Sequence, residues 1–373
     1  MSGIRPRRPV AEQGLLDIMG MTSDEFVAAS FEQGVPRGRA LQAYRTMFRE
    51  GRFEGDWFGI EDPPVNRREV EGQTTKFTLA LGDDHETESV LIPMHHRKHG
   101  TTRTLCVSSQ IGCAMGCEFC ETAQMGLVRN LSAGQIVSQW WAATHRVDTT
   151  VKNMVFMGMG EPMDNLDEVL QSIRVLTDHN GPAVPSSNIS ISTVGRIDGI
   201  NRVAEFVKQP GYHRLNLAIS VNAPNDRIRS ELMPINRAMK MSELQEALLA
   251  FPLRGGAAFC AEYVLIPGVN DGDDHCDELS RWLEPLRCSL NVIPYNPRRD
   301  SPWPAPEEHD VERFISRAIA NGCFVKRRGT KGRDVMAACG QLGNPEIRRR
   351  KRVEGSGLVQ PVVEGRSLKV DPR

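Results

Sequence analysis

The feature of this sequence that most constrains its fold is an alternation of strand-like and helix-like segments that begins near residue 103. Six short runs rich in apolar and β-branched residues read TLCVSS, VKNMVFMGM, NISISTV, RLNLAISV, AFCAEYVLI and SLNVIPY. The stretches between them, such as LDEVLQSIRVLTD and MSELQEALLAF, have the apolar spacing of amphipathic helices. Strands that alternate with helices form parallel βα units. The sequence therefore predicts an α/β fold with a partial (βα)6 TIM-like barrel.

The segments outside this repeat predict smaller parts of the fold. Thr22 and Glu25 form a capping-box pattern that begins a helix, and Gly51 ends a second helix. Residues 52–74 are rich in Gly, Pro and charge, which is typical of a linker. The runs KFTLALG and ETESVLIPM alternate like the strands of a hairpin. We expect four parts: a small helical N-terminal domain with its linker at 1–74, a β-hairpin extension at 75–98, the barrel core at 99–335, and a C-terminal segment at 336–373.

Composition and charge exclude several classes of protein. The formal net charge is −1 and 40% of the residues are apolar, which is typical of a globular protein. No stretch approaches the roughly 20 unbroken apolar residues that a membrane helix needs. The opening residues MSGIRPRRPVAEQG are basic without a following apolar run, so we expect no secretory signal. The nine cysteines then indicate reduced thiols and a cytoplasmic location.

Polar or glycine-rich segments follow five of the six predicted strands. A loop with three cysteines follows the first strand, GMGEP at 158–162 follows the second, and Ser192 follows the third. Ser220 and Asn222 follow the fourth strand, and Asn296 follows the sixth. Working residues of such barrels collect at the carboxyl ends of the strands. We therefore predict a functional site at this rim.

The loop after the first strand contains Cys113, Cys117 and Cys120 within eight positions. A structural zinc ion needs four ligands, and Cys106 could supply the fourth. A cubane [4Fe–4S] cluster usually takes four cysteines. If three cysteines hold it, one iron stays open to bind a small molecule, as a catalytic zinc keeps one free position. Both cofactors fit the spacing at this point.

Several motifs carry a resemblance to a known family. TLCVSSQIGCAMGCEFC, FMGMGEPMDN, AISVNAPND, LIPGVND, NVIPYNP and AACGQL resemble, in order, motifs of the RlmN/Cfr family of radical S-adenosylmethionine (SAM) rRNA methyltransferases. The similarity covers residues 80–345 and, more loosely, the N-terminal helices. It implies a radical SAM core that methylates adenosine C2 in the peptidyl transferase centre of 23S rRNA. It also implies methylation of tRNA, at the adenosine 3′ of the anticodon.

The resemblance further implies cofactors and partners. Cys113, Cys117 and Cys120 would hold a [4Fe–4S] cluster, whose open iron chelates the amino and carboxyl groups of SAM. Each turnover would use two SAM molecules. The residues implied to contact SAM are Gly160, Glu161, Ser192, Ser220, Val221, Asn222 and Asn296. Beside rRNA and tRNA, the implied partner is a reductant such as flavodoxin or ferredoxin, and we expect a monomer.

The resemblance also implies catalytic roles for Cys106 and Cys339. C2 of adenine is electron-poor and cannot attack the methyl sulfonium of SAM directly. Cys339 would therefore accept a methyl group from one SAM and carry it to the base as a carbon radical. Cys106 would release the product by forming a disulfide with Cys339. Glu88 matches the family's proton-acceptor position, although Glu86 and Glu88 on one strand face also fit a solvated surface.

Some positions depart from the family pattern. Asn222 stands where the family usually has His, and Glu121 and Met125 stand where Ser and Gln are commoner. GMGEP favours the RlmN side over the Cfr side, which methylates C8, confers ribosomal antibiotic resistance and typically lacks this proline. Three hypotheses remain: an adenine-C2 methyltransferase, a Cfr-like C8 methyltransferase, and a non-catalytic RNA-binding protein with zinc on Cys106 and the three-cysteine loop.

A basic run near the carboxyl end extends over residues 326–352. It contains ten Lys or Arg residues against Asp334 and Glu346 alone. A cluster of this density can bind RNA phosphates. A solvated tail is the alternative interpretation, because most terminal charge runs are solvated.

Overall fold

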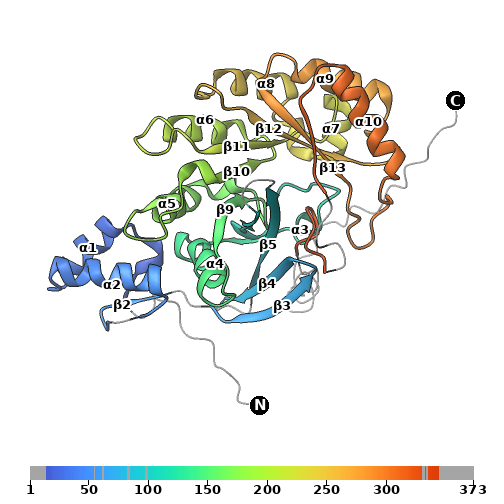
Figure 1. Ribbon diagram of the computed structural model, residues 1–373. Helices are drawn as coiled ribbons and strands as arrows, with labels where there is room; N and C mark the ends of the chain where they lie inside the picture. The colour runs from blue at the N-terminus through green and yellow to red at the C-terminus, as the bar shows by residue number, and fades with distance from the viewer. Residues whose placement is uncertain are drawn as a thin grey trace, which may run out of the picture.

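The structure is a computed structural model. It describes residues 14–343 apart from 54, 61–62, 82–84, 97–99, 330–331 and 333–334. The main body of this part is one mixed sheet flanked by helices (Figure 1). In spatial order its strands are β14 (Val325–Arg327), β13 (Cys288–Pro294), β12 (Phe259–Leu265), β11 (Asn216–Ser220), β10 (Ile189–Thr193), β9 (Val151–Phe156), β6 (Gly100–Cys106), β5 (Glu86–His96), β4 (Thr74–Ala80) and β3 (Val65–Glu71).

Within this sheet, β6, β9, β10, β11, β12, β13 and β14 pair in parallel, which confirms the predicted α/β fold. The helices among them are α3 (Glu121–Gln124), α4 (Ala133–His145), α5 (Leu166–Thr177), α6 (Ile197–Phe206), α7 (Asp226–Leu232), α8 (Met241–Ala250), α9 (Asp273–Leu283) and α10 (Glu308–Ala320). The six predicted runs form β6, β9, β10, β11, β12 and β13. β14 is an additional parallel strand that the sequence did not predict, because it is short and two of its three residues are basic. Within the described ranges, no helix is both long and apolar enough to span a bilayer.

The two faces of the parallel strands carry different side chains. Ile189, Ile191 and Val292 belong to the apolar core on the helix-covered side. Because side chains alternate along a strand, the residues between them face the opposite side. That inner side carries the functional residues described below.

Three antiparallel strands extend the sheet beyond β6. β6 pairs with β5, β5 with β4, and β4 with β3. β4 and β5 form at the predicted hairpin. β3 lies in the segment predicted as a linker, and that prediction is wrong for residues 65–71. β3 forms an edge of the sheet, where Arg68 and Glu69 are exposed, so its charged composition resembles that of a loop.

The predicted N-terminal helices are present. The elements of this part are β1 (Leu16–Asp17), α1 (Ser23–Glu32), α2 (Arg37–Glu50) and β2 (Phe58–Gly59). The Glu25 carboxylate accepts a hydrogen bond from the Thr22 N–H at 2.8 Å, and the Thr22 hydroxyl accepts one from the Glu25 N–H at 3.4 Å. This is the predicted capping box. Gly51 ends α2 with a left-handed φ of 66°.

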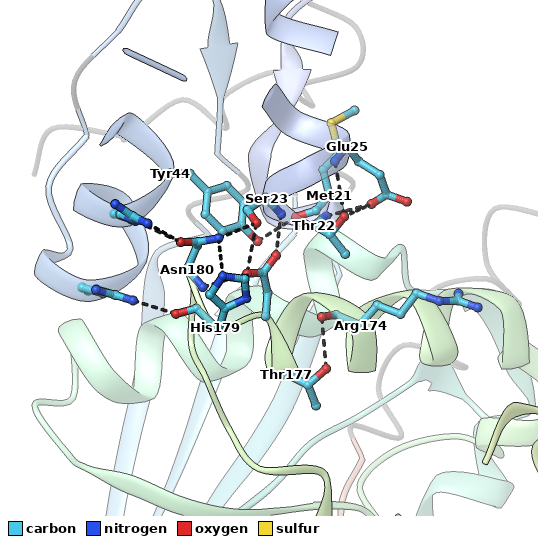
Figure 2. A network of polar contacts seen from close by, with 12 residues as sticks. Met21, Thr22, Ser23, Glu25, Tyr44, Arg174, Thr177, His179 and Asn180 are labelled. Atoms are coloured by element: carbon cyan, nitrogen blue, oxygen red, sulfur yellow. Dashed lines mark hydrogen bonds and ion pairs between the residues drawn. The ribbon is translucent and has the colours of Figure 1, made fainter. Parts of the chain in front are cut away.

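A polar network attaches these helices to the core at the turn after α5 (Figure 2). The Asp178 carboxylate accepts hydrogen bonds from the Ser23 N–H at 2.6 Å and from the Ser23 hydroxyl at 3.1 Å. The Asn180 side chain donates to the Ser23 hydroxyl at 3.0 Å and accepts from Arg45 at 2.7 Å. The GMGEP segment lies just before α5 in the chain, so the network joins the N-terminal helices to the element that follows the site.

Candidate active site

One cavity at the carboxyl ends of the parallel strands gathers most of the predicted site residues. The predicted residues that line it are Cys113, Cys117, Cys120, Gly160, Glu161, Ser192, Ser220, Asn222, Asn296 and Cys339. Val221 is fully buried between two of them. Cys106 and Glu88 are also buried, but they are not among the lining residues. Loops that are distant in the sequence thus meet around a single space.

A short antiparallel ribbon holds the three-cysteine loop. β7 (Gln110–Gly112) precedes the loop and pairs with β8 (Leu127–Asn130), which follows it. The Cys113 N–H donates to the Gly126 carbonyl at 3.1 Å. Gly112 has a φ of +74°, and a Cβ there would lie 1.8 Å from the same carbonyl oxygen. Only glycine fits this position, so the ribbon geometry depends on it.

The environment of the three thiols fits an iron–sulfur cluster. Burial raises the pKa of Cys113 to about 12. Burial also raises the pKa of Cys117 well above its usual value, and the nearby thiols of Cys120 and Cys113 raise it further. Phe119 and other apolar side chains pack around them. Three such thiols ionise together only when cations bind them, and the irons of a cluster supply that charge.

A single metal ion fits the same residues less well. Among the residues that the structure describes, no group of three or more His, Cys, Asp or Glu is arranged to hold one ion. A four-iron cluster is wider than one ion and takes cysteines that lie further apart. Cys106, the fourth ligand of the zinc hypothesis, does not line the cavity. The zinc hypothesis therefore lacks its fourth ligand at the loop.

The GMGEP segment packs closely against the loop after β6. The Gly158 N–H donates to the Val107 carbonyl at 3.0 Å, and a Cβ on Gly158 would lie 2.7 Å from that oxygen. Gly160 has a φ of +100°, and its Cβ would lie 2.6 Å from the Cβ of Gln110. The Glu161 N–H donates to the Gln110 side chain at 2.9 Å. The two glycines are needed because these loops approach each other without room for side chains.

The Glu161 carboxylate joins two of the loops around the cavity. One oxygen accepts a hydrogen bond from the Met163 N–H at 3.1 Å, and the other accepts one from the Val194 N–H at 2.9 Å. Burial raises the pKa of Glu161 to about 7, although these donors lower it. A positively charged group in the cavity would favour the ionised carboxylate. Glu161 therefore fits a site for a ligand with an amino group.

The structure gives a physical reason for Asn222, which departs from the family pattern. Its backbone is left-handed with a φ of 55°, a conformation that Asn and His adopt more readily than most residues. Its side-chain oxygen accepts a hydrogen bond from the Val264 N–H at 2.9 Å. Its carbonyl accepts one from the Asn270 side chain at 2.8 Å. Asn222 thus holds the loop after β11 against β12, at the wall of the cavity.

The segment that carries Cys339 is attached on several sides. The Gly340 carbonyl accepts a hydrogen bond from the Glu121 N–H at 2.7 Å, next to the three-cysteine loop. The Gln341 side chain donates to the Pro297 carbonyl at 3.0 Å. The Lys76 ammonium donates to the Met336 carbonyl at 3.3 Å. These contacts hold Cys339 over the cavity, between the cluster loop and the antiparallel strands.

Glu88 takes part in the same attachment. It is only 5% exposed, so a solvated position is wrong for this residue, whereas Glu86 is partly exposed and pairs with Arg67. The Glu88 carboxylate lies 3.2 Å from the Lys76 ammonium and accepts a hydrogen bond from the Gly343 N–H at 3.2 Å. Glu88 therefore anchors the Cys339 segment. Its role as proton acceptor stays a prediction.

Cys106 and Cys339 lie near each other and share a cation. Burial, and then Cys339, raise the pKa of Cys106 to about 12. Burial also raises the pKa of Cys339, whereas Arg328 lowers it. The Arg328 guanidinium lies 3.2 Å from the Glu262 carboxylate, which also accepts a hydrogen bond from the Ser192 hydroxyl at 3.0 Å. The cation that acts on the Cys339 thiol is therefore paired with a carboxylate in the wall of the cavity.

Glu262 and Arg328 were not predicted from the sequence. An acid inside the apolar run AFCAEYVLI was a signal, because a buried carboxylate needs a partner. Arg328 belongs to the basic run predicted to bind RNA phosphate, but it faces inward. Its neighbour Arg327 is paired with Glu308. Residues 331, 333 and 344–352 of that run lie outside the described residues.

Comparisons with known proteins agree with this geometry. Residues 107–279 match the radical SAM superfamily. The probable dual-specificity RNA methyltransferase RlmN 1 of Protochlamydia amoebophila is 40% identical over 90% of this chain and 96% of its own length. The dual-specificity RNA methyltransferase RlmN of Geobacter sulfurreducens is 34% identical over 88% of this chain and 92% of its own. A radical SAM methyltransferase from Sphaerobacter thermophilus has a crystal structure similar to this one, with a TM-score of 0.81, 34% identity, and coverage of 88% of this chain and 99% of that one.

Proposed function

Because the chain belongs to the RlmN family of radical SAM RNA methyltransferases, we propose that it methylates C2 of adenosine in 23S rRNA and in tRNA. Its cofactors are a [4Fe–4S] cluster and SAM. Each turnover uses two molecules of SAM. The relatives' description as dual-specificity enzymes supports two RNA substrates. The targets are the adenosine of the peptidyl transferase centre and the one 3′ of the anticodon. The electron donor is a flavodoxin or ferredoxin, and the enzyme acts as a cytoplasmic monomer.

The observation that carries this proposal is that Cys339 lines the same cavity as Cys113, Cys117 and Cys120. The three-cysteine loop would hold the cluster, and the lining residues around Glu161 and Asn296 would hold SAM. Bound there, the cluster and SAM supply a 5′-deoxyadenosyl radical. The buried walls exclude water, which protects such a reactive species.

Cys339 is proposed to carry the methyl group. Its thiolate attacks the methyl carbon of the first SAM, so an S–C bond forms and S-adenosylhomocysteine leaves. Loss of one hydrogen atom from this S-methyl group leaves a carbon radical. That carbon adds to C2 of adenine, and the adduct gives up the C2 proton to a base and one electron, which the oxidised cluster would accept. The RNA is then attached covalently to Cys339.

Cys106 is proposed to release the RNA. Its thiolate attacks the Cys339 sulfur, so a disulfide forms and the bond between sulfur and carbon breaks. The electron pair stays on the carbon, which takes a proton and becomes the methyl group. The burial of Cys106 beside Cys339 supports this step, because the attacking sulfur needs no long movement.

The test is nucleoside mass spectrometry of RNA treated with the reconstituted enzyme. The substrates are 23S rRNA and tRNA from a strain that lacks this methylation. We expect 2-methyladenosine in both RNAs. 8-Methyladenosine would instead assign the chain to the Cfr-like reaction. Iron-free protein with no methylated nucleoside would favour the zinc-containing RNA-binding protein.

Replacing Arg328 with Gln is expected to slow the methylation of Cys339 about tenfold or more at neutral pH. The change removes the positive charge that lowers the Cys339 pKa, and it leaves the Glu262 carboxylate, which raises that pKa, unpaired. Since the thiolate is the nucleophile, the rate should recover as the pH rises. The measurement is the pH profile of methyl uptake by Cys339, followed by intact-protein mass spectrometry.

Two variants control for general damage. Arg328→Lys keeps a positive charge and should keep much of the rate at neutral pH. Arg317→Gln breaks an ion pair with Asp277 between α9 and α10, outside the site, and should leave the profile unchanged. An unshifted profile in Arg328→Gln would show that Arg328 does not control the thiol.

A further inference from the structure

Arg229 is a buried cation that the proposed chemistry has not used. It lies on α7 and is one of the largest side chains with no exposed surface. The four hydrogen bonds described for its guanidinium all go to neutral oxygens, three from backbone carbonyls and one from an amide side chain. A charge that is buried without a carboxylate in contact costs free energy. We therefore expect a negative group elsewhere in the site to balance it.

The guanidinium holds the loops after β10 and β11 together. It donates to the Val194 carbonyl at 2.6 Å, to the Ser220 carbonyl at 3.1 Å and to the Val221 carbonyl at 3.1 Å. Val194 also donates its N–H to the Glu161 carboxylate at 2.9 Å, so Glu161 and Arg229 both hold this residue. A planar guanidinium presents five N–H donors in a fixed fork, which lets it serve carbonyls of two loops at once. The same loops carry residues that are proposed to contact SAM.

An amide separates Arg229 from the carboxylate that acts on it. The Asn236 side chain accepts a hydrogen bond from Arg229 at 3.0 Å and donates one to the Asp226 carboxylate at 2.8 Å. Burial lowers the pKa of Arg229 to about 10, whereas Cys117 and Asp226 raise it. Asp226 thus offsets only part of the buried charge.

Arg229 also acts on the three-cysteine loop. Burial and the neighbouring thiols raise the pKa of Cys117, whereas Arg229 lowers it. The loop rests on α7, because the Glu118 N–H donates to the Leu232 carbonyl at 3.0 Å. Ile228 and Leu232 belong to the same apolar cluster as the cysteines. Charges interact more strongly across such an apolar region than they do in water.

We propose that Arg229 is a positioning residue of the cluster site, which holds the loops after β10 and β11 and raises the reduction potential of a cluster bound to Cys117. The inference rests on the proposed assignment of the cluster to the three-cysteine loop. Reduction adds one negative charge to the cluster, and a buried cation nearby stabilises the reduced form. Arg229 therefore favours the reduced state from which radical SAM chemistry starts.

An anaerobic redox titration of the reconstituted protein, followed by electron paramagnetic resonance, tests the role of the charge. Arg229→Met should make the midpoint potential more negative by about 59 mV, which is tenfold in the equilibrium constant of a one-electron reduction. Asp226→Asn removes the opposing charge and keeps an oxygen for the Asn236 side chain and the Met241 N–H, so its potential should become more positive. Arg227→Met is the matched control, because Arg227 is exposed on the same helix, and its potential should not change.

Arg229→Lys separates the charge from the positioning. Lys keeps the charge, so the midpoint potential should stay close to that of the unmodified protein. Its single nitrogen cannot serve all the acceptors of the guanidinium fork, so the loops lose hydrogen bonds. The dissociation constant for SAM should therefore rise about tenfold. The measurement is the change that SAM causes in the spectrum of the reduced cluster.

An unchanged potential in both Arg229→Met and Asp226→Asn would overturn the inference. Asp226→Asn keeps the test decisive if Arg229→Met does not fold. Equal shifts in Arg229→Met and Arg229→Lys would also overturn it, because the loss of charge would then not be the cause. Unmodified protein that binds no iron and sulfide would overturn both the cluster assignment and the inference. Variants with the expected potentials, in an enzyme that makes no methyladenosine, would support the inference and contradict the proposed function.

Discussion

Replacing Cys106 with Ala is expected to give a protein that purifies with RNA attached covalently to Cys339. Cys106 is needed only after the carbon has bonded to the base. The variant should therefore take up the methyl group, react with RNA and stop, because no second thiol remains to break the bond between sulfur and carbon. The adduct should be sensitive to nuclease and resistant to denaturant.

Gel electrophoresis under denaturing conditions and mass spectrometry of the nuclease-treated protein measure this adduct. Cys339→Ala should show neither methylated protein nor adduct, because the carrier sulfur is gone. Cys276→Ala is the matched control, since Cys276 is fully buried outside the site and donates to the Phe314 carbonyl at 3.6 Å. Cys106→Ala protein that is free of RNA and makes methyladenosine at the normal rate would remove Cys106 from the mechanism.

Replacing Cys117 with Ala is expected to abolish the iron–sulfur cluster and all radical turnover together. Cys117 is buried between the other two cysteines of the loop, and three thiolates are the smallest set that holds a cubane while one iron stays open. Iron and sulfide analysis after anaerobic reconstitution, with the absorbance of the cluster, measures the loss. Cys288→Ala lies outside the loop and should bind iron normally. A complete cluster in Cys117→Ala would show that the ligands are wrong.

The parts of the fold that were predicted from the sequence are those with a strong local pattern. The six predicted strands alternate with amphipathic helices along the chain. Thr22 and Glu25, three residues apart, form the capping box that begins α1. β3 and β14 were missed because their charged residues have the composition of loops, and only their neighbours in the sheet make them strands. Their pairing is a property of the tertiary structure.

The residues of the candidate site also divide into those with a local sequence pattern and those defined by tertiary contacts. The spacing of the three cysteines is local, so it could be recognised in the sequence. The partnership of Arg328 with Glu262 joins residues 66 positions apart and depends on strand pairing across the sheet. Glu88 was considered as either a solvated or a catalytic acid, but it anchors the Cys339 segment through Lys76 and Gly343. Such contacts have no signature along the chain.

The claim that the methyl group passes through Cys339 is tested most directly with SAM that carries a trideuterated methyl group. The proposed route places the intact label on the Cys339 sulfur and then removes one deuterium atom before the carbon reaches the base. Mass spectrometry should therefore find a 2-methyladenosine that retains two deuterium atoms, with the third in 5′-deoxyadenosine. A product with all three deuterium atoms, or a Cys339 peptide that never carries the label, would contradict the route.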